Sequence, residues 1–242
     1  MPAHAHDRRP FDEQAVVSTY EDWYATGFGA LADELELDLL DRLLRGLPRG
    51  SSILEVGCGT GHFGAALGAR GYEVSGVDLA GAMLQRARTR FPVALADAAQ
   101  LPFAGASFDA VVLIAVLDFV PDPLAVLREA QRVARGNVVV LALVSHSLLA
   151  VRRRVSARRG HAIFSTARFY SRRRLLGDAR RALAPDCDMR VAETHQILVL
   201  PPSIAGRLPA LERWLSRRDL PCGGILGFRL EAGSGPQIDD VS

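Results

Sequence analysis

Ile53-Leu54-Glu55-Val56-Gly57-Cys58-Gly59-Thr60-Gly61 is the stretch of sequence that decides the fold. Its apolar residues suit a strand buried in a parallel sheet, and Glu55 lies near the end of that strand. The three alternating glycines allow a tight turn whose backbone can approach a ligand closely. Residues 62–67 read as the first turns of a helix, whose free N–H groups would converge on a bound ligand. The pattern predicts a nucleotide-type site between a strand and a helix.

Two interpretations of this turn compete. Residues 59–64 match the dinucleotide pattern G-x-G-x-x-G, and Asp78 follows at the end of the next expected strand. The glycine run begins at Gly57, however, which is two residues before the dinucleotide frame. Glu55 is also unsuited to a pyrophosphate, whereas an acid suits a ligand that carries an α-amino group beside a sulfonium. The residues therefore favour S-adenosylmethionine over a nicotinamide dinucleotide.

Residues 55–61 resemble motif I of the class I S-adenosylmethionine-dependent methyltransferases, and the type 11 branch is the most similar. Further segments agree in order along the chain. Residues 72–84 resemble the second strand with its ribose-binding acid, and residues 96–103 resemble the adenine segment. Residues 107–112 resemble the fourth strand, and residues 124–133 resemble the helix after it. The resemblance extends over residues 50–145 and is looser on both flanks.

Strand-like and helix-like segments alternate along the chain, which is typical of the α/β class. We expect strands near 52–57, 73–78, 93–96, 108–114, 137–144, 190–199 and 224–230. We expect helices near 62–70, 80–90, 122–134, 170–183 and 206–217. Five strands before residue 150 predict a doubly wound, Rossmann-like sheet. The resemblance implies seven strands, mostly parallel, with an antiparallel last strand.

The 242 residues are enough for one large domain with covering segments. We expect an N-terminal helical lid over 1–45, a cofactor-binding domain over 46–231 and a flexible tail over 232–242. Residues 146–185 lie where similar enzymes carry a substrate-covering insertion. The first nine residues lack the apolar core of a signal peptide, and the three cysteines show no pairing or zinc spacing. These features predict a cytoplasmic protein without a metal site.

The resemblance implies that the loop residues Gly57, Cys58, Gly59 and Gly61 bind the cofactor. It also implies that Glu55 orients the methionine end through the loop backbone or a water. The alternative is that the glycines only make a tight turn and that Glu55 only anchors loop N–H groups.

Further cofactor contacts follow from the same resemblance. Asp78 would accept hydrogen bonds from both ribose hydroxyls, because a carboxylate has two acceptor oxygens. Leu79 and Met83 would pack against the adenine, although Met83 can equally be interior filler. Asp97 would accept from the exocyclic amine while the Ala98 N–H donates to a ring nitrogen. For Asp97 the alternative is a turn residue.

The methionine side of the site is expected to be lined by Ile114 at the end of the fourth strand. Apolar walls there would exclude water and favour an SN2 transfer governed by positioning. In similar enzymes the N-terminal segment folds over the cofactor, and Tyr20 or Tyr24 would place a hydroxyl near its methionine end. The neighbouring aromatics, Trp23 and Phe28, can instead pack on the helix that contains Leu31.

The sequence does not identify a catalytic base. The turn after the fourth strand often carries Glu-His in similar enzymes, where this chain has Asp118-Phe119. His146, after the fifth strand, is the best candidate for a general base. A structural loop histidine is the alternative for His146, and a helix cap is the alternative for Asp118.

All 29 basic residues are arginine, which indicates a coding bias. Residues 152–181 hold eleven arginines and one acid, Asp178, for a local charge of 11 − 1 = +10. This segment can bind an acidic substrate, a phosphate-bearing carrier or an anionic membrane surface, or it can be a solvated helical face. RNA is disfavoured because the aromatic residues lack stacking-motif spacing.

The resulting prediction is a methyltransferase that uses S-adenosylmethionine, releases S-adenosylhomocysteine and transfers the methyl group to a small-molecule or lipid-like acceptor, which can be acidic. One alternative is a protein that binds the cofactor without transferring a methyl group. The other is an NAD(P)-dependent oxidoreductase, which Glu55 and the turn register disfavour.

Overall fold

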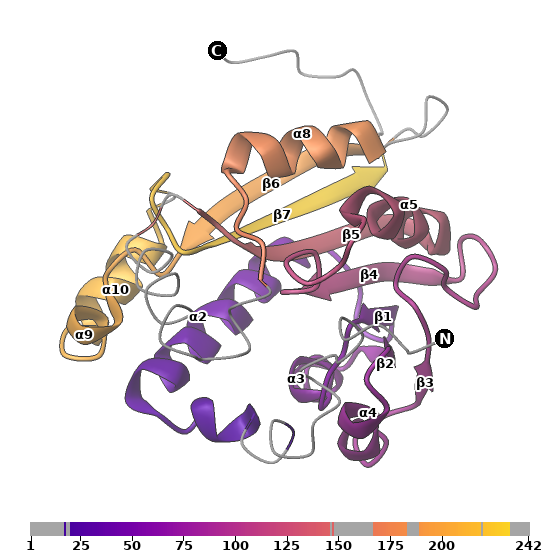
Figure 1. The fold of residues 1–242 in the computed structure, drawn as a ribbon, viewed down its shortest axis with the longest axis horizontal. Coiled ribbons are helices and arrows are strands. Elements are labelled where there is room, and N and C mark those ends of the chain that lie inside the picture. The colour runs from indigo at the N-terminus through magenta and orange to yellow at the C-terminus, as the bar shows by residue number, and fades with distance from the viewer. Residues whose placement is uncertain are drawn as a thin grey trace, which may run out of the picture.

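A seven-stranded sheet forms the centre of the molecule in the computed structural model (Figure 1). The structure describes residues 17, 20–145, 147, 167–182, 189–218 and 220–232. The strands are β1 Ser52–Val56, β2 Glu73–Asp78, β3 Val93–Leu95, β4 Phe108–Ile114, β5 Ala134–Leu143, β6 Met189–Ile197 and β7 Ile225–Ala232.

The strand order is β3-β2-β1-β4-β5-β7-β6. Every neighbouring pair from β3 to β5 is parallel, whereas β7 is antiparallel to both β5 and β6. The predicted α/β class and the antiparallel last strand are therefore confirmed. The chain leaves β1 toward β2 and later returns to its other side as β4, so a crevice is expected where β1 and β4 end.

Helices cover both faces of the sheet (Figure 1). They are the 3-10 helix η2 Glu21–Trp23 and the α-helices α2 Gly27–Leu43, α3 His62–Ala69, α4 Gly81–Ala87, α5 Pro123–Val133, α8 Arg172–Ala182, α9 Pro202–Ala205 and α10 Pro209–Ser216. Helices α2 and α3 pack on one face, and α5 and α8 pack on the other. Apolar residues point to both faces of β4, with Val111 in one core and Val112 in the other, as a buried parallel strand requires.

Local sequence signals explain most element boundaries. Helix α5 begins at Pro123, whose missing N–H costs nothing at that position, and the Asp122 side chain accepts hydrogen bonds from the next two N–H groups of the helix. The suggestion that Asp118 caps this helix is therefore wrong. The helix predicted over 206–217 is present as α10, which begins three residues later at Pro209, whereas the short helix α9 was not predicted.

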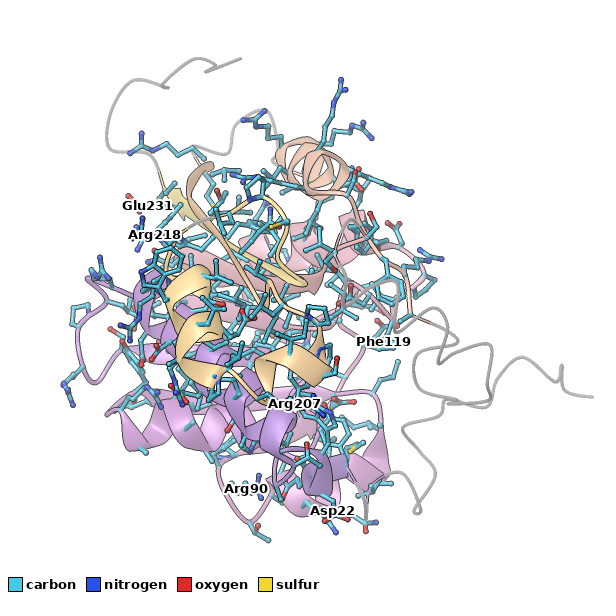
Figure 2. The ribbon with its side chains drawn as sticks, turned by 90° about the vertical axis from the view of Figure 1, so that its left-hand side faces the viewer. Asp22, Arg90, Phe119, Arg207, Arg218 and Glu231 are labelled. Carbon is cyan, nitrogen blue, oxygen red and sulfur yellow. The ribbon has the colours of Figure 1, made fainter. Side chains whose placement is uncertain are left out.

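The N-terminal part of the chain lies against the cofactor half of the sheet. A Glu21–Arg90 ion pair of 2.9 Å joins η2 to the end of α4, and Figure 2 shows Asp22 and Arg90 on the same lower edge. Helix α2 buries Leu31, Leu35 and Leu39 in the core. No helix in the described part of the chain combines the length and the hydropathy needed to cross a membrane.

The predicted domain boundaries stay predictions. Residues 1–16, most of the arginine-rich insertion and all of the tail except Ala232 lie outside the described residues.

Candidate functional site

The turn after β1 has the backbone conformation that its glycines predicted. Gly57, Gly59 and Gly61 have φ angles of 70°, 53° and 81°. The N–H groups of Gly57 and Cys58 both donate to Val77 O, at 2.7 and 3.0 Å, which fixes the turn against β2. A Cβ atom at Gly57 would lie 2.5 Å from a methyl group of Val116. This position therefore excludes any side chain.

Gly59 shows the opposite environment. Its N–H donates to Asp78 Oδ2 at 2.8 Å, and a Cβ atom there would meet nothing within 4 Å. The backbone is held firmly while the space above it stays open. The turn therefore forms a cradle that a ligand can enter.

Asp78, at the end of β2, holds two backbone groups. Its Oδ1 accepts from the Ala80 N–H at 2.8 Å, and its Oδ2 accepts from Gly59. Each carboxylate oxygen can accept a second hydrogen bond. The loop and the predicted ribose contact thus depend on the same carboxylate, and the ribose contact stays a prediction.

Glu55 is a buried acid beneath this turn, and only 2% of its surface is exposed. Its Oε2 has no hydrogen-bond partner among the described residues. Burial raises the pKa of Glu55 to about 8, against the lowering effect of the Gly64 N–H, and the charge of Asp78 raises the pKa further. Because one oxygen of this buried carboxyl group lacks a partner, the site favours a ligand that brings N–H donors.

A cavity of about 240 Å³ opens beside the turn. Its walls come from the N-terminal segment, the turn after β1, the end of β4 and the meeting point of β5 and β7. The lining residues are Tyr20, Trp23, Tyr24, Glu36, Glu55, Gly57, Cys58, Gly59, Thr60, His62, Phe63, Ile114, Ala115, Phe119, Leu141, Ala142, Leu143 and Ile225. The structure thus brings Tyr20, Tyr24, Glu55, the first loop residues and Ile114 to one cavity, and their contact with a cofactor stays a prediction.

The cavity wall holds two buried acids, of which Glu55 keeps its proton up to a pH of about 8. Glu36 of α2, with 8% exposure, and Glu55 both line it, and no arginine lines it within the described ranges. Burial raises the pKa of Tyr20 to about 12 and that of Tyr24 still further, and Glu36 adds to both shifts. The two phenols hydrogen-bond to each other and stay protonated. The wall is suited to a cationic, partly apolar ligand.

His62 adds a titratable group that the sequence did not single out. Its Nε2 lies 2.7 Å from Asp33 Oδ1 of α2, and the Tyr24 ring stacks on its imidazole with centroids 4.1 Å apart. These two contacts fix the ring at the cavity wall. Because a neighbouring carboxylate orients the imidazole, its other nitrogen is a candidate proton acceptor.

Leu79, Met83, Asp97 and Ala98 do not line this cavity. Met83 is buried against Val17 and Ala80, as interior filler would be. Asp97 is exposed and accepts from the Ala99 N–H at 2.9 Å, as a turn residue would. Both contacts match the structural alternatives, and adenine binding by these four residues stays a prediction.

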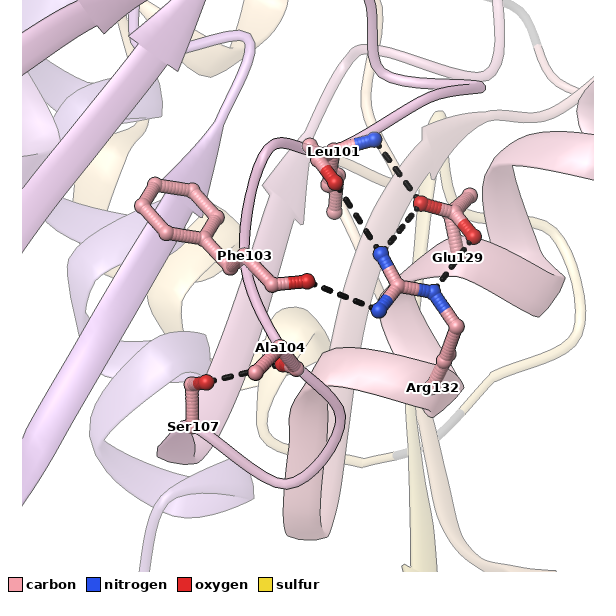
Figure 3. A network of polar contacts seen from close by, with 6 residues as sticks. All are labelled: Leu101, Phe103, Ala104, Ser107, Glu129 and Arg132. Atoms are coloured by element: carbon pink, nitrogen blue, oxygen red, sulfur yellow. Dashed lines mark hydrogen bonds and ion pairs between the residues drawn. The ribbon is translucent and has the colours of Figure 1, made fainter.

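The segment after β3 is anchored by one polar network (Figure 3). The Arg132 guanidinium of α5 donates to Phe103 O at 2.8 Å and to Leu101 O at 3.0 Å. Glu129 accepts from Arg132 at 2.7 Å and from the Leu101 N–H at 2.8 Å. The network fixes the last residues of the predicted adenine segment, 96–103.

Asp118 lies outside the cavity lining and is fully buried. Its Oδ1 accepts from the Leu143 N–H at 3.1 Å, and its backbone carbonyl accepts from the Arg168 N–H at 2.7 Å. These bonds join the turn after β4 to the end of β5, so a structural role accounts for the residue. His146, the other predicted base, lies outside the described residues.

The arginine-rich segment is described only in part, from residue 167 to residue 182. Arg174 and Arg181 flank Asp178 on α8, with N–O distances of 3.7 and 3.3 Å. Their side chains are mostly exposed, as on a solvated helical face. Among the described residues, no group of three histidine, cysteine or acidic side chains could hold a metal ion.

Sequence reasoning missed Glu36, His62, Phe119 and the β5–β7 wall. Glu36 did leave a signal, because it interrupts the leucine-rich face of α2 at a buried position four residues before Leu40. His62 left none, since its partner Asp33 is 29 residues away.

Comparison with known proteins agrees with this geometry. Residues 54–142 match a family model described as a methyltransferase domain. A malonyl-[acyl-carrier protein] O-methyltransferase of Serratia marcescens is 35% identical over 136 residues, 54% of this chain and 52% of that protein. An uncharacterized protein of Mycobacterium tuberculosis is 32% identical over 197 residues, 78% of this chain and 63% of that protein. The chain thus spans about half to two thirds of these relatives.

Two solved structures share the fold. One is a methyltransferase of Thermotoga maritima described as a possible histamine N-methyltransferase, with a TM-score of 0.70, 24% identity, and coverage of 91% of this chain and 98% of that one. The other is the magnesium protoporphyrin IX methyltransferase of Synechocystis with bound S-adenosylhomocysteine, with a TM-score of 0.66, 13% identity, and coverage of 93% and 98%. Residues 54–142 are thus similar to a methyltransferase domain of the type 11 family, and the whole chain shares the fold of solved methyltransferases.

Proposed function

We propose that this chain is a class I, S-adenosylmethionine-dependent methyltransferase that acts on a small-molecule or lipid-like acceptor. One observation carries the proposal: a cavity beside the open glycine cradle is lined by two buried carboxylates and by no arginine in the described ranges. Within the described ranges this wall offers no arginine to the pyrophosphate of a nicotinamide dinucleotide.

The residues of the site suit S-adenosylmethionine. That molecule supplies an electrophilic methyl group on a cationic sulfonium. Asp78 would hold its ribose, the backbone around Gly59 would pass beneath it, and Glu55 would face the α-amino group. The open space above Gly59 and the unpartnered Oε2 of Glu55 support this assignment.

The apolar part of the cavity would position the acceptor and exclude water. Ile114, Phe119, Leu143 and Ile225 form this part of the wall. Water exclusion protects the methyl group from solvent and leaves orientation as the main source of rate. The apolar wall supports an acceptor with a hydrophobic body.

Two groups in the wall would accept a proton from the acceptor if the reaction requires it. They are the Glu36 carboxylate and the His62 imidazole, which Asp33 orients. An acceptor that is already ionised, or a sulfur or carbon nucleophile, would need neither group. The absence of a histidine at residue 119 is therefore compatible with transfer.

A turnover assay tests the activity. The purified protein is incubated with S-adenosylmethionine and panels of phenols, carboxylic acids, amines and lipids, and S-adenosylhomocysteine is quantified. We expect acceptor-dependent formation of S-adenosylhomocysteine with at least one apolar acceptor. Binding of the cofactor without turnover on any panel would favour the alternative, a non-catalytic S-adenosylmethionine-binding protein. A cytoplasmic location also stays a prediction from the sequence.

A further inference from the structure

Large apolar side chains are exposed on the connection between β6 and β7. Of the six such side chains in the described part of the chain, four lie within this connection: Ile204, Leu208, Leu211 and Trp214, each between 43% and 51% exposed. Ile204 lies on α9, Leu208 directly precedes α10, and Leu211 and Trp214 are three residues apart on one face of α10. Single exposed apolar residues are ordinary, but several such residues close together mark a surface that binds another molecule or a membrane.

Helix α10 is turned with its polar side inward. Glu212 and Ser216 are fully buried, whereas Leu211 and Trp214 face solvent. The buried carboxylate accepts from the N–H groups of Val199 and Leu200 at 2.8 and 2.7 Å, and the Ser216 hydroxyl donates to it at 2.7 Å. These bonds fix the orientation of the helix, so the outward apolar face is built into the fold.

Among the described residues of this connection, the exposed charged side chains are arginines. They are Arg207, Arg217 and Arg218, and the Arg218 guanidinium lies 4.2 Å from the centre of the Trp214 ring. The acid of α10, Glu212, is buried, and Glu34 of α2 is paired with Arg213 at 2.6 Å. Figure 2 shows Arg207 and Arg218 beside the helices of this connection, at its two ends.

The same face lies at the edge of the sheet where the cavity opens. Ile197 at the end of β6 is in register with Ile225 of β7, which is in register with Leu143 of β5. Leu143 and Ile225 line the cavity, and α9 begins at Pro202, shortly after β6 ends at Ile197. A surface bound by α9 and α10 would therefore be close to the cavity.

We propose that the apolar face of α9 and α10, formed by Ile204, Leu208, Leu211 and Trp214, inserts into the interface of an anionic lipid bilayer. Aliphatic and tryptophan side chains with flanking arginines are the composition of helices that lie in a membrane interface. The apolar side chains would enter the acyl boundary while Arg207, Arg217 and Arg218 contact lipid phosphates. This interaction does not depend on the proposed activity.

Vesicle binding tests the proposal with the full chain. Partition is measured by co-sedimentation with vesicles of phosphatidylcholine alone and of phosphatidylcholine with phosphatidylglycerol. We expect binding to the anionic vesicles that weakens with salt. The double variant L211S/W214S should bind at least about tenfold more weakly, because two buried apolar side chains are lost. R207Q/R218Q should lose about fivefold per arginine.

Leu95→Ser is the matched control, since Leu95 is exposed on the distant edge strand β3, and its binding should equal that of the wild type. In a Trp23→Phe background, Trp214 is the single tryptophan and its emission should shift to the blue on binding.

Three results would overturn the proposal. The first is no binding to anionic vesicles. The second is binding that L211S/W214S leaves intact, which would assign it to the arginines of residues 152–181. The third is a dimer in solution that the same substitutions dissociate, which would show that a second copy covers this face.

Discussion

At the scale of single residues, the unusual protonation of Glu55 follows from its place beneath the glycine turn. Burial raises its pKa from 4.5 to about 8. Between these values the folded state holds a proton that the unfolded state has released. The free energy of unfolding must therefore fall as the pH rises through this window.

We predict that Glu55→Gln removes this pH dependence, because the amide does not titrate. The wild type should lose stability on the order of a few kcal/mol between pH 5 and pH 8 relative to the variant. Urea unfolding of both proteins at the two pH values measures the difference. An equal pH dependence in both proteins would mean that Glu55 is ionised throughout.

A second residue-scale prediction concerns Gly59. Alanine at this position would have the Cβ in open space, so Gly59→Ala should cost only about 1–2 kcal/mol of stability for its left-handed backbone. The same Cβ would occupy the proposed cofactor space, so binding of S-adenosylmethionine should be abolished.

Gly46→Ala is the control for Gly59→Ala. Gly46 has a φ of 91° and open space around it, but it lies outside the cavity lining. The Gly46→Ala variant should be destabilised by a similar amount and should bind the cofactor like the wild type. Normal binding by the Gly59 variant would contradict the proposed path of the cofactor over the turn.

At the scale of elements, the contact between α5 and the segment after β3 links stability to the adenine end of the site. Arg132→Ala removes the donors to Leu101 O and Phe103 O and leaves Glu129 without its ion pair. We expect a loss of about 1–3 kcal/mol and faster hydrogen exchange at the Leu101 amide.

Arg128→Ala, an exposed arginine on the same helix, should change neither stability nor exchange. Unchanged exchange at Leu101 in the Arg132 variant would show that the segment is held by its apolar contacts alone.

The sequence predicted most elements because their signals are local. Strand β4 is apolar on both faces, Asp122-Pro123 starts α5, and the glycines with positive φ mark the turn after β1. The start of β5 was missed by three residues because Ala134 follows α5 without an intervening loop.

Contacts between distant segments could not be predicted in the same way. The orientation of α10 depends on bonds from Glu212 to N–H groups 13 and 12 residues earlier, which no local pattern encodes. For the same reason only one of the two acids in the cavity wall could be identified from the sequence. Glu55 was recognisable from the motif, whereas Glu36 reaches the cavity through the packing of α2.

At the scale of the whole molecule, the fold brings an N-terminal helix, a glycine turn and the ends of β4, β5 and β7 around one cavity. The central claim is that this cavity and its cradle take S-adenosylmethionine. Calorimetric titration of S-adenosylmethionine, S-adenosylhomocysteine and a nicotinamide dinucleotide tests that claim most directly. The variants to compare are Asp78→Ala and, as a surface control, Asp41→Ala, which loses only an exposed pair with Arg70.

We predict binding of S-adenosylmethionine and S-adenosylhomocysteine with a Kd on the order of micromolar. Asp78→Ala should weaken the binding of both ligands at least about tenfold, and Asp41→Ala should leave the binding of both unchanged. The dinucleotide should not bind. Failure of both adenosyl ligands to bind, or preference for the dinucleotide, would contradict the account.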